Sequence, residues 1–490
     1  MHDNDDVFYR AMLARDFRFD GKFFVAVKTT GIYCRPICRA PQPKRKNIEF
    51  FSNAILAENA GYRPCLRCRP ECAPQSSAWA GKTAVVKRAI KVIAATQLSE
   101  LRENEFAEQF GLSARHLRRL FTDELGQTPK QIYDISRLNF ARRLVVDTQI
   151  AMTTIAATVG FRSLRRFNDA FKKRFARAPS QLRRRGIRPS DDGAIEIRLS
   201  YRPPFDWEAL IDNIGSHSIA GVESIQGGAF ERVVEVDGDV AWIQVHHQAK
   251  LAQVSLRIVT ENPKILFQVV ARVRRMFDLD SDPIVIEECF SRAKALLPLL
   301  KRYPGLRLPN GWDAFETAIC TILGQLVSVE QARRLVGQVV ENYGEEIEHP
   351  LRKEKVRVFP KPEALAKADL LLVKTTAVRR ATIREFSQKV ADGALDLSAA
   401  QDLAVLRKRL LDIKGVGPWS AEYICMRAIG DTDAFPGSDL ILKRAVDLHP
   451  NLDLEKVRPW RAYAALYLWK GFARELSRKK SPKKGPKEKV

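Results

Sequence analysis

The stretch DIKGVGPWSAEY, residues 412–423, decides how the C-terminal half of this chain is interpreted. Amphipathic segments flank it on both sides, and its two glycines stand two residues apart. This spacing predicts a hairpin between two helices, with bare backbone amides that face outward. Amides at the start of a helix attract anions, and a DNA phosphate fits such a site. The residues predicted to contact a DNA backbone are Lys414, Gly415, Val416 and Gly417.

A lone carboxylate follows the hairpin. Asp439 stands twenty residues after Trp419, in the segment PGSDL at 436–440, where a Pro-Gly pair precedes another apolar helix. One interpretation is that it caps this helix, the usual role of such a residue. The hairpin and the spaced aspartate together resemble the helix-hairpin-helix DNA glycosylases, in which the hairpin grips the backbone and a following aspartate does the chemistry. The resemblance implies that Asp439 is catalytic.

The composition indicates a multidomain protein that binds nucleic acid. A chain of 490 residues is too long for one hydrophobic core. Its formal net charge of +24, from 82 Lys and Arg against 58 Asp and Glu, attracts a polyanion. The sequence has no apolar run of about 18 residues and no signal-peptide pattern. We expect a cytoplasmic, nucleoid-associated bacterial protein that binds double-stranded DNA and no membrane.

Four cysteines have the spacing of a metal site. They form two short pairs, and such pairs place four thiolates around one tetrahedral Zn²⁺. One interpretation is a purely structural zinc ion, which stabilises a small domain that lacks a large core. The other is a zinc ion that also activates one of the thiolates as a nucleophile. Disulfides are not expected in a reducing compartment. The predicted ligands are Cys34, Cys38, Cys65 and Cys68.

The residues around these cysteines favour a zinc site that also activates a thiolate. The segments TGIYCRPICR (30–39) and AGYRPCLRC (60–68) resemble the N-terminal domain of the Ada-type adaptive-response regulators. In that family the first cysteine is a zinc ligand and accepts a methyl group from a DNA methylphosphotriester. The resemblance implies a domain over 1–78 with Cys34 as a stoichiometric methyl acceptor. Four thiolates on one Zn²⁺ sum to a charge of about −2, which one methylation lowers to about −1, so we expect repair to tighten DNA binding.

Residues 83–187 are predicted to be all-helical, after a short linker at 76–82. Two helix-turn-helix units are expected, because Gly111 and Gly160 can each make the turn while Ser113 and Ser163 cap the helices that follow.

The second unit, GFRSLRRFNDAFKKRFARAP at 160–179, resembles the AraC-type transcription factors. This implies promoter sites as DNA partners and makes RNA polymerase a further candidate partner. The side chains predicted to contact bases are Arg115, His116 and Arg119 in the first unit, and Arg162, Arg165, Arg166 and Asn168 in the second.

From residue 194 the hydrophobic period changes from helical to strand-like. An antiparallel α+β module over 194–285 is therefore predicted. Its expected strands lie at 194–199, 231–236, 240–246 and 251–259, with a helix near 265–277.

Residues 288–475 are predicted to be helical. The segment ICTILGQLVSV (319–329) and the preceding sheet resemble the 3-methyladenine DNA glycosylase II family along nearly its whole length. The resemblance implies that Leu326 is the wedge that fills the space of an extruded base, although ordinary helix packing would also explain an apolar residue there. An aromatic pocket for a cationic alkylated base is expected from Trp419, Tyr423 and Trp469.

The expected fold class is thus multidomain α+β: a small zinc-binding domain, an all-α tandem helix-turn-helix domain, an antiparallel α+β module and an all-α helix-hairpin-helix glycosylase domain. A disordered basic tail is predicted over 476–490, where lysines predominate.

The predicted function is a monofunctional DNA glycosylase for alkylated purines, fused to a methylphosphotriester-sensing regulator. Trp419 stands where bifunctional relatives carry a lysine nucleophile, so water is the expected nucleophile, and no cofactor is expected for excision. The family often has an aromatic residue where this chain has Lys470, and an acid where it has Ser438. These two departures leave the substrate range open. The alternative is a methylation-activated transcription factor whose glycosylase part is only a DNA-binding platform.

Overall fold

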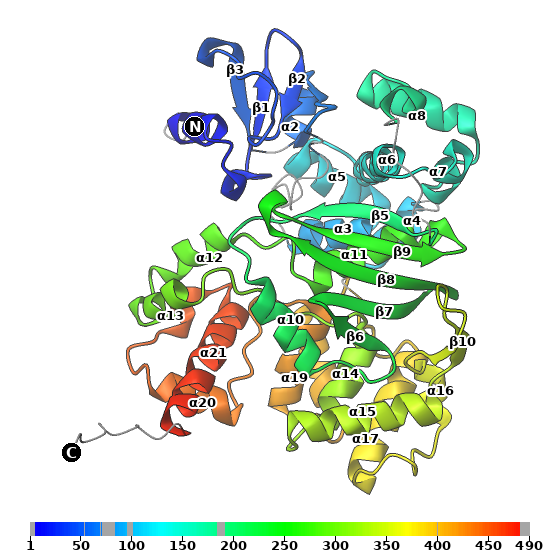
Figure 1. Cartoon of the computed structure of the whole chain (residues 1–490), viewed down its shortest axis with the longest axis vertical. Helices are drawn as coiled ribbons and strands as arrows, with labels where there is room; N and C mark the ends of the chain where they lie inside the picture. Colours follow the sequence, from blue (N-terminus) through cyan, green and yellow to red (C-terminus); the bar gives the residue numbers. More distant parts are fainter. Residues whose placement is uncertain are drawn as a thin grey trace, which may run out of the picture.

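The computed structural model describes residues 5–52, 54–68, 70, 84–95, 101–183, 192–398 and 400–480. The linker at 76–82 and residues 481–490 of the predicted tail lie outside the described residues. Figure 1 shows the N-terminal domain and the helix-turn-helix helices on one side of a large sheet, with the C-terminal helices on the other. Among the described residues, no helix combines the length and the apolar character needed to span a bilayer.

The N-terminal domain is a small sheet that brings two pairs of cysteines together. Strand order is β3-β1-β2-β4. β2 and β4 run parallel with Tyr33 opposite Pro64, so the cysteines that follow each residue become neighbours. The elements are α1 (Asp5–Leu13), β1 (Phe24–Val27), β2 (Ile32–Cys34), β3 (Ile48–Phe51), α2 (Ala54–Asn59) and β4 (Arg63–Pro64).

The second domain confirms the two helix-turn-helix units. Gly111 and Gly160 both have positive φ, 67° and 76°, the left-handed conformation that glycine favours. Ser113 and Ser163 accept hydrogen bonds of 3.3 Å from the backbone N–H groups of His116 and Arg166. The helices are α3 (Ala84–Ala95), α4 (Glu103–Glu108), α5 (Ala114–Leu125), α6 (Pro129–Asp147), α7 (Met152–Thr158), α8 (Leu164–Phe175) and α9 (Pro179–Leu182).

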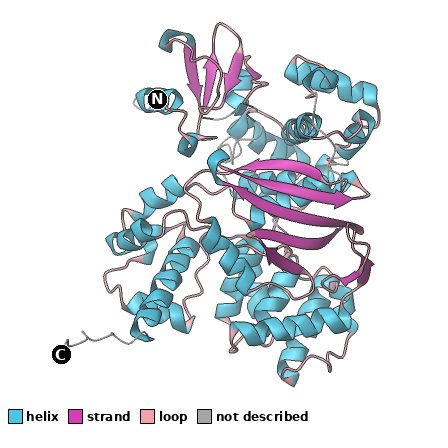
Figure 2. Cartoon of the chain, in the orientation of Figure 1, coloured by secondary structure: helices cyan, strands magenta, loops and turns pink. Residues whose placement is uncertain are grey.

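The predicted α+β module is an antiparallel sheet of strand order β5-β9-β8-β7-β6 (Figure 2). Helix α11 (Leu266–Met276) lies where a helix was expected, whereas α10 (Trp207–Ser216) and β6 were not anticipated. β6 is a short edge strand without alternating burial, so its sequence carries little strand signal. The strands are β5 (Ile195–Ser200), β6 (Glu223–Gln226), β7 (Ala229–Val236), β8 (Asp239–Gln248) and β9 (Gln253–Thr260).

The helix-turn-helix domain shares a hydrophobic core with this sheet. Phe140 of α6 meets Phe267 of α11 edge to face, with ring centroids 5.1 Å apart. A second contact joins the helix-turn-helix domain to the C-terminal helices: the guanidinium of Arg88 in α3 lies 3.7 Å from the carboxylate of Asp402, the N-cap of the helix Leu403–Leu411. The two halves of the chain are therefore packed against each other rather than merely tethered.

The C-terminal part is helical with one exception. A two-stranded hairpin of β10 (Glu346–Glu348) and β11 (Lys355–Arg357) interrupts the expected helices. Its strands are short and mostly charged, so they carry no apolar pattern that predicts a strand. The helices are α12 (Pro283–Phe290), α13 (Leu297–Arg302), α14 (Ala314–Leu323), α15 (Val329–Tyr343), α16 (Pro362–Lys367), α17 (Ala377–Ala391), α18 (Leu403–Leu411), α19 (Pro418–Ile424), the π-helical turn η8 (Cys425–Ile429), α20 (Leu440–Asp447) and α21 (Arg461–Lys480). α21 thus runs into the segment predicted as a basic tail.

Candidate functional site

The turn between α18 and α19 is a tight hairpin. Gly415 has φ of 93°, and a β-carbon there would collide with the side chain of Thr382, so only glycine fits. Thr382 donates to the carbonyl of Lys414 at 2.8 Å, and Gln325 donates to the carbonyl of Gly415 at 2.9 Å. These two bonds from neighbouring side chains fix the conformation of the turn. Lys414, Gly415 and Gly417 are exposed, whereas the Val416 side chain is buried and anchors the turn.

The predicted wedge, Leu326, stands beside this hairpin. Its side chain is fully exposed (103%), and its φ of 56° is a left-handed conformation that a leucine rarely adopts. Ordinary helix packing therefore does not explain this residue. Its neighbour Gln325 is fixed by two further hydrogen bonds. The Gln325 side-chain amide donates to the Ser420 hydroxyl of α19 at 2.7 Å, and its backbone carbonyl accepts from Arg379 of α17 at 2.5 Å.

The predicted pocket residues lie together around Asp439. The indole N–H groups of Trp419 and Trp469 each donate to the Asp439 carboxylate at 3.1 Å. Tyr423 stacks on Trp419 with ring centroids 5.1 Å apart and meets Trp469 edge to face at 6.4 Å. All four residues are half-buried, so the cluster is partly accessible to solvent rather than sealed in a core.

Asp439 is both a helix cap and a partner of the two predicted pocket indoles. As N-cap of α20, it accepts a 2.8 Å hydrogen bond from the backbone N–H of Leu442. Its two oxygens thus receive three N–H donors, two of them from aromatic rings. The two interpretations offered by the sequence are therefore compatible. The cap bond and the two indole bonds together fix the orientation of the carboxylate beside the aromatic rings.

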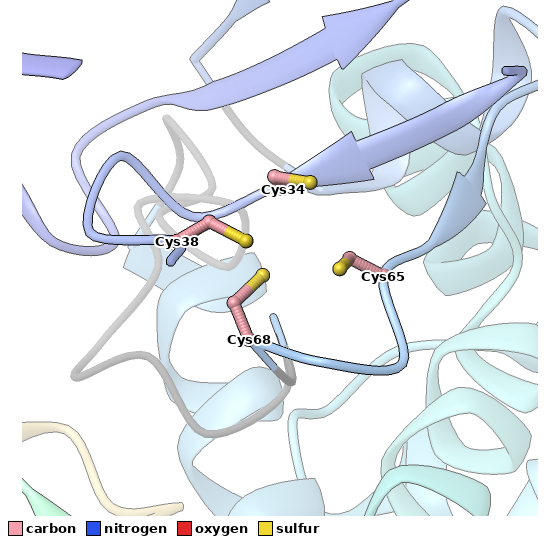
Figure 3. Close-up of side chains that lie close together, drawn as sticks. All are labelled: Cys34, Cys38, Cys65 and Cys68. Atoms are coloured by element: carbon pink, nitrogen blue, oxygen red, sulfur yellow. The ribbon is translucent and has the colours of Figure 1, made fainter. Parts of the chain in front are cut away.

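The four predicted zinc ligands converge, as Figure 3 shows. The sulfur atoms of Cys34, Cys38, Cys65 and Cys68 all lie within 4.8 Å of one another. A Zn–S bond of about 2.3 Å places tetrahedral sulfurs about 3.8 Å apart, and the separations in the cluster are compatible with such a site. The backbone N–H of Arg35 donates to Cys68 Sγ at 3.3 Å, which is the kind of bond that stabilises a thiolate ligand. A fifth cysteine of this region, Cys72, is not among the predicted ligands and lies outside the described residues.

The predicted base-contacting residues are displayed on the helices that follow the two turns. Six of them are exposed, while Asn168 is half-buried. On α5 they are Arg115, His116 and Arg119; Arg162 precedes the cap of α8, and Arg165, Arg166 and Asn168 lie in its first turns.

Two contacts between the zinc domain and the helix-turn-helix domain were not anticipated. Arg174 of α8 forms two hydrogen bonds with the carboxylate of Glu58, and Tyr33 donates to the same carboxylate. Arg142 of α6 donates to the backbone carbonyl of Cys65, one of the predicted zinc ligands, at 2.9 Å. Arg174 and Glu58 are 116 residues apart, so no local pattern could have predicted the pair.

These features define a class of protein: a DNA-repair protein that joins a four-cysteine metal domain, tandem helix-turn-helix units and a glycosylase-type helical domain. Residues 7–71 match the metal binding domain of Ada, 106–185 match a helix-turn-helix domain family, and 196–313 match the AlkA N-terminal domain.

Relatives extend over the whole chain. It is 34% identical over 486 residues to the probable bifunctional transcriptional activator/DNA repair enzyme AlkA of Mycobacterium tuberculosis, covering 96% of this chain and 97% of that protein. It is 27% identical to DNA-3-methyladenine glycosylase 2 of Escherichia coli, covering 55% of this chain and 95% of that protein. It is 36% identical to the bifunctional transcriptional activator/DNA repair enzyme Ada of Escherichia coli, covering 32% and 43%. The chain belongs to the family of bifunctional transcriptional activator/DNA repair enzymes of the AlkA and Ada type.

Proposed function

We propose that the C-terminal half excises alkylated purines of the 3-methyladenine type from duplex DNA by hydrolysing the N-glycosidic bond. The observation that carries this proposal is the Asp439 carboxylate held by the indoles of Trp419 and Trp469, with Tyr423 stacked on Trp419. The similarity to DNA-3-methyladenine glycosylase 2 supports the choice of substrate.

Lesion binding begins with the DNA backbone. The hairpin at 414–417 receives a phosphate, while the exposed Leu326 fills the space left by the extruded base. Extrusion costs a few kcal/mol, and less for a lesion that pairs poorly. An alkylated purine is cationic, so each good contact with Trp419, Tyr423 or Trp469 contributes about 0.5–2 kcal/mol. The pocket therefore favours the charged lesion over normal bases.

Asp439 then performs the electrostatic part of the reaction. As the C1′–N bond breaks, its electron pair leaves with the base and positive charge develops on the sugar. The carboxylate stabilises this charge and orients a water molecule, whose oxygen bonds to C1′ while its proton passes by way of the carboxylate to solvent. The residue after the hairpin is Trp419, and an indole cannot form a Schiff base. The products are a free base and an intact abasic strand, and no cofactor takes part.

In the N-terminal domain, Cys34 is the methyl acceptor. Its sulfur attacks the methyl carbon of a DNA methylphosphotriester, the C–O bond breaks, and the electron pair stays on the phosphate, which becomes an ordinary diester. One zinc ion held by the four cysteines would keep their thiols deprotonated. Cys34 is partly exposed, as an acceptor must be, whereas Cys65 is buried. The reaction is stoichiometric, and the loss of one negative charge tightens DNA binding.

The helix-turn-helix domain directs the protein to promoter sites, and RNA polymerase is the second partner. The alternative function is a methylation-activated transcription factor that uses its glycosylase part only to hold DNA. The direct test is to incubate the full-length protein with alkylated duplex DNA and to measure released bases by chromatography. Release of 3-methyladenine supports the enzyme, whereas DNA binding without any release supports the alternative.

A further inference from the structure

Charged side chains from three helices hold the segment that leads to Asp439. Residues 431–438, here called the connector, join η8 to α20, whose cap is Asp439. The connector contains neither a helix nor a strand, so contacts with neighbouring elements contribute to fixing its path. The helices that hold it are α18, which leads into the hairpin turn, α19, which carries two of the predicted pocket aromatics, and α21, which carries the third.

The first clamp comes from α18. The guanidinium of Arg407 binds the carboxylate of Asp431 at the start of the connector. It also donates to Glu422 of α19, from Nε at 2.7 Å and from Nη2 at 3.3 Å. Burial opposes the charge of Arg407, but its hydrogen bonds to Glu422 and Asp431 outweigh burial and raise its pKa. Arg407 thus remains charged and ties both carboxylates to the helix that enters the hairpin.

The second clamp comes from α19. Glu422 Oε2 accepts a 3.0 Å hydrogen bond from the backbone N–H of Phe435, in the middle of the connector. Glu422 lies three residues after Trp419 and directly before Tyr423, on the helix that supplies both aromatic rings. The same carboxylate therefore links the pocket wall with the chain that delivers Asp439 to it.

The third clamp comes from α21, the helix of Trp469. Arg461, its first residue, donates to both oxygens of Asp433 at 2.9 Å. Arg458 donates to the same carboxylate at 2.9 Å. Each helix that supplies a part of the pocket therefore also holds the connector.

We infer that Glu422 and Arg407 are positioning residues for base excision: they fix the connector so that the Asp439 carboxylate meets both indoles. The inference rests on the proposed catalytic role of Asp439. Neither residue contacts the reacting atoms in this account. A displacement of a reacting group by about 1 Å can slow a reaction about 100-fold, so a loosened connector should lower the rate of excision more than DNA affinity.

The test uses full-length Glu422→Ala and Glu422→Gln under single-turnover conditions on alkylated duplex, with affinity for abasic duplex and the melting temperature measured in parallel. Glu422→Ala should slow excision about 10- to 100-fold with abasic-DNA affinity within about twofold of the parent. Glu422→Gln keeps one oxygen for the Phe435 N–H but loses the charge and the second oxygen, which accepts from Arg407 Nε, so it should lie between the parent and Glu422→Ala. Glu354→Ala, which breaks the exposed pair with Arg352 in the β10–β11 turn, is the matched control and should change nothing.

Two results would overturn the inference. One is excision by Glu422→Ala at the parent rate; the other is a loss of rate, affinity and melting temperature in step, which indicates general destabilisation. Asp439→Asn in the same assay separates the two claims. If it excises at the parent rate, the proposed catalytic role fails; if it is inactive while Glu422→Ala is fully active, only the positioning role fails.

Discussion

Glu58 of the zinc domain and Arg174 of the second helix-turn-helix unit form a bidentate ion pair, with both N···O distances 2.8 Å. The two side chains are only 17% and 11% exposed, respectively. Tyr33, the residue before the proposed methyl acceptor, donates to the same carboxylate at 2.6 Å. The cysteine cluster and α8 are therefore connected through a short chain of hydrogen bonds.

This pair should stabilise the contact between the two domains. Arg174→Ala leaves a mostly buried carboxylate without its partner, which costs about 3 kcal/mol. A double-mutant cycle of Glu58→Ala and Arg174→Ala, followed by urea unfolding, measures the coupling between the two side chains. We expect the double variant to be more stable than the sum of the single changes predicts. Additive losses would show that the pair contributes nothing.

The cysteine cluster should hold one zinc ion per chain. Elemental analysis of the purified protein should find one equivalent, and Cys68→Ala should lose it, because three thiolates bind zinc less tightly than four. Cys289→Ala is the control, since that buried cysteine lies outside the cluster. A Cys68→Ala protein that stays folded with a full equivalent of zinc would reject this site.

Methylation should act as an electrostatic switch. After exposure to methylphosphotriester DNA, mass spectrometry should find one methyl group on Cys34, and the affinity for promoter DNA should rise. Salt screens charges over about 10 Å at 0.1 M, so the gain in affinity should shrink as salt increases. A methyl group on Cys38 would refute the assignment of the acceptor, and unchanged affinity would remove the switch.

Leu326→Ala should weaken excision without affecting the fold. The wedge side chain is fully exposed in the free protein, so its truncation leaves no cavity. Burial of a leucine in DNA is worth about 1.5–3 kcal/mol, so the affinity for lesion-containing duplex should fall about tenfold or more. Leu371→Ala removes another exposed leucine and serves as control. Equal effects of the two variants would argue against a specific wedge.

The product should be an intact abasic strand. Borohydride added during turnover traps a Schiff base between an amine and C1′, and none should form because Trp419 occupies the position after the hairpin. Recovery of a covalent protein–DNA adduct would reveal an amine nucleophile and contradict the hydrolytic mechanism.

Local signals predicted much of this architecture. Gly111, Gly160 and Gly415 mark turns because each adopts a positive φ, and Ser113 and Ser163 mark helix starts because their hydroxyls cap them. Cysteine spacing predicted the cluster for a similar reason, since each pair sits in one short turn. All of these features depend on residues that are close in the sequence.

Contacts between distant residues were not predictable in this way. The pair of Glu58 with Arg174 and the bond of Glu422 to the Phe435 backbone depend on how separate helices pack. A charged residue on a helix is ordinarily a solvated one, so sequence alone gives it no partner. The charged β10–β11 hairpin was missed because its strands lack an apolar face. The wedge role of Leu326 was predicted only through a family resemblance.

The central claim is that Asp439 is a catalytic carboxylate and not merely a helix cap. Asparagine caps helices about as well as aspartate, so Asp439→Asn should preserve the bond to the Leu442 N–H and the start of α20. The variant carries no charge to stabilise the sugar cation. The most direct measurement is single-turnover release of 3-methyladenine from alkylated duplex by the parent and by Asp439→Asn, at matched occupancy of the DNA. We predict a loss of at least about 100-fold in rate with DNA affinity retained; release at the parent rate would show that Asp439 is only a cap and would contradict the account.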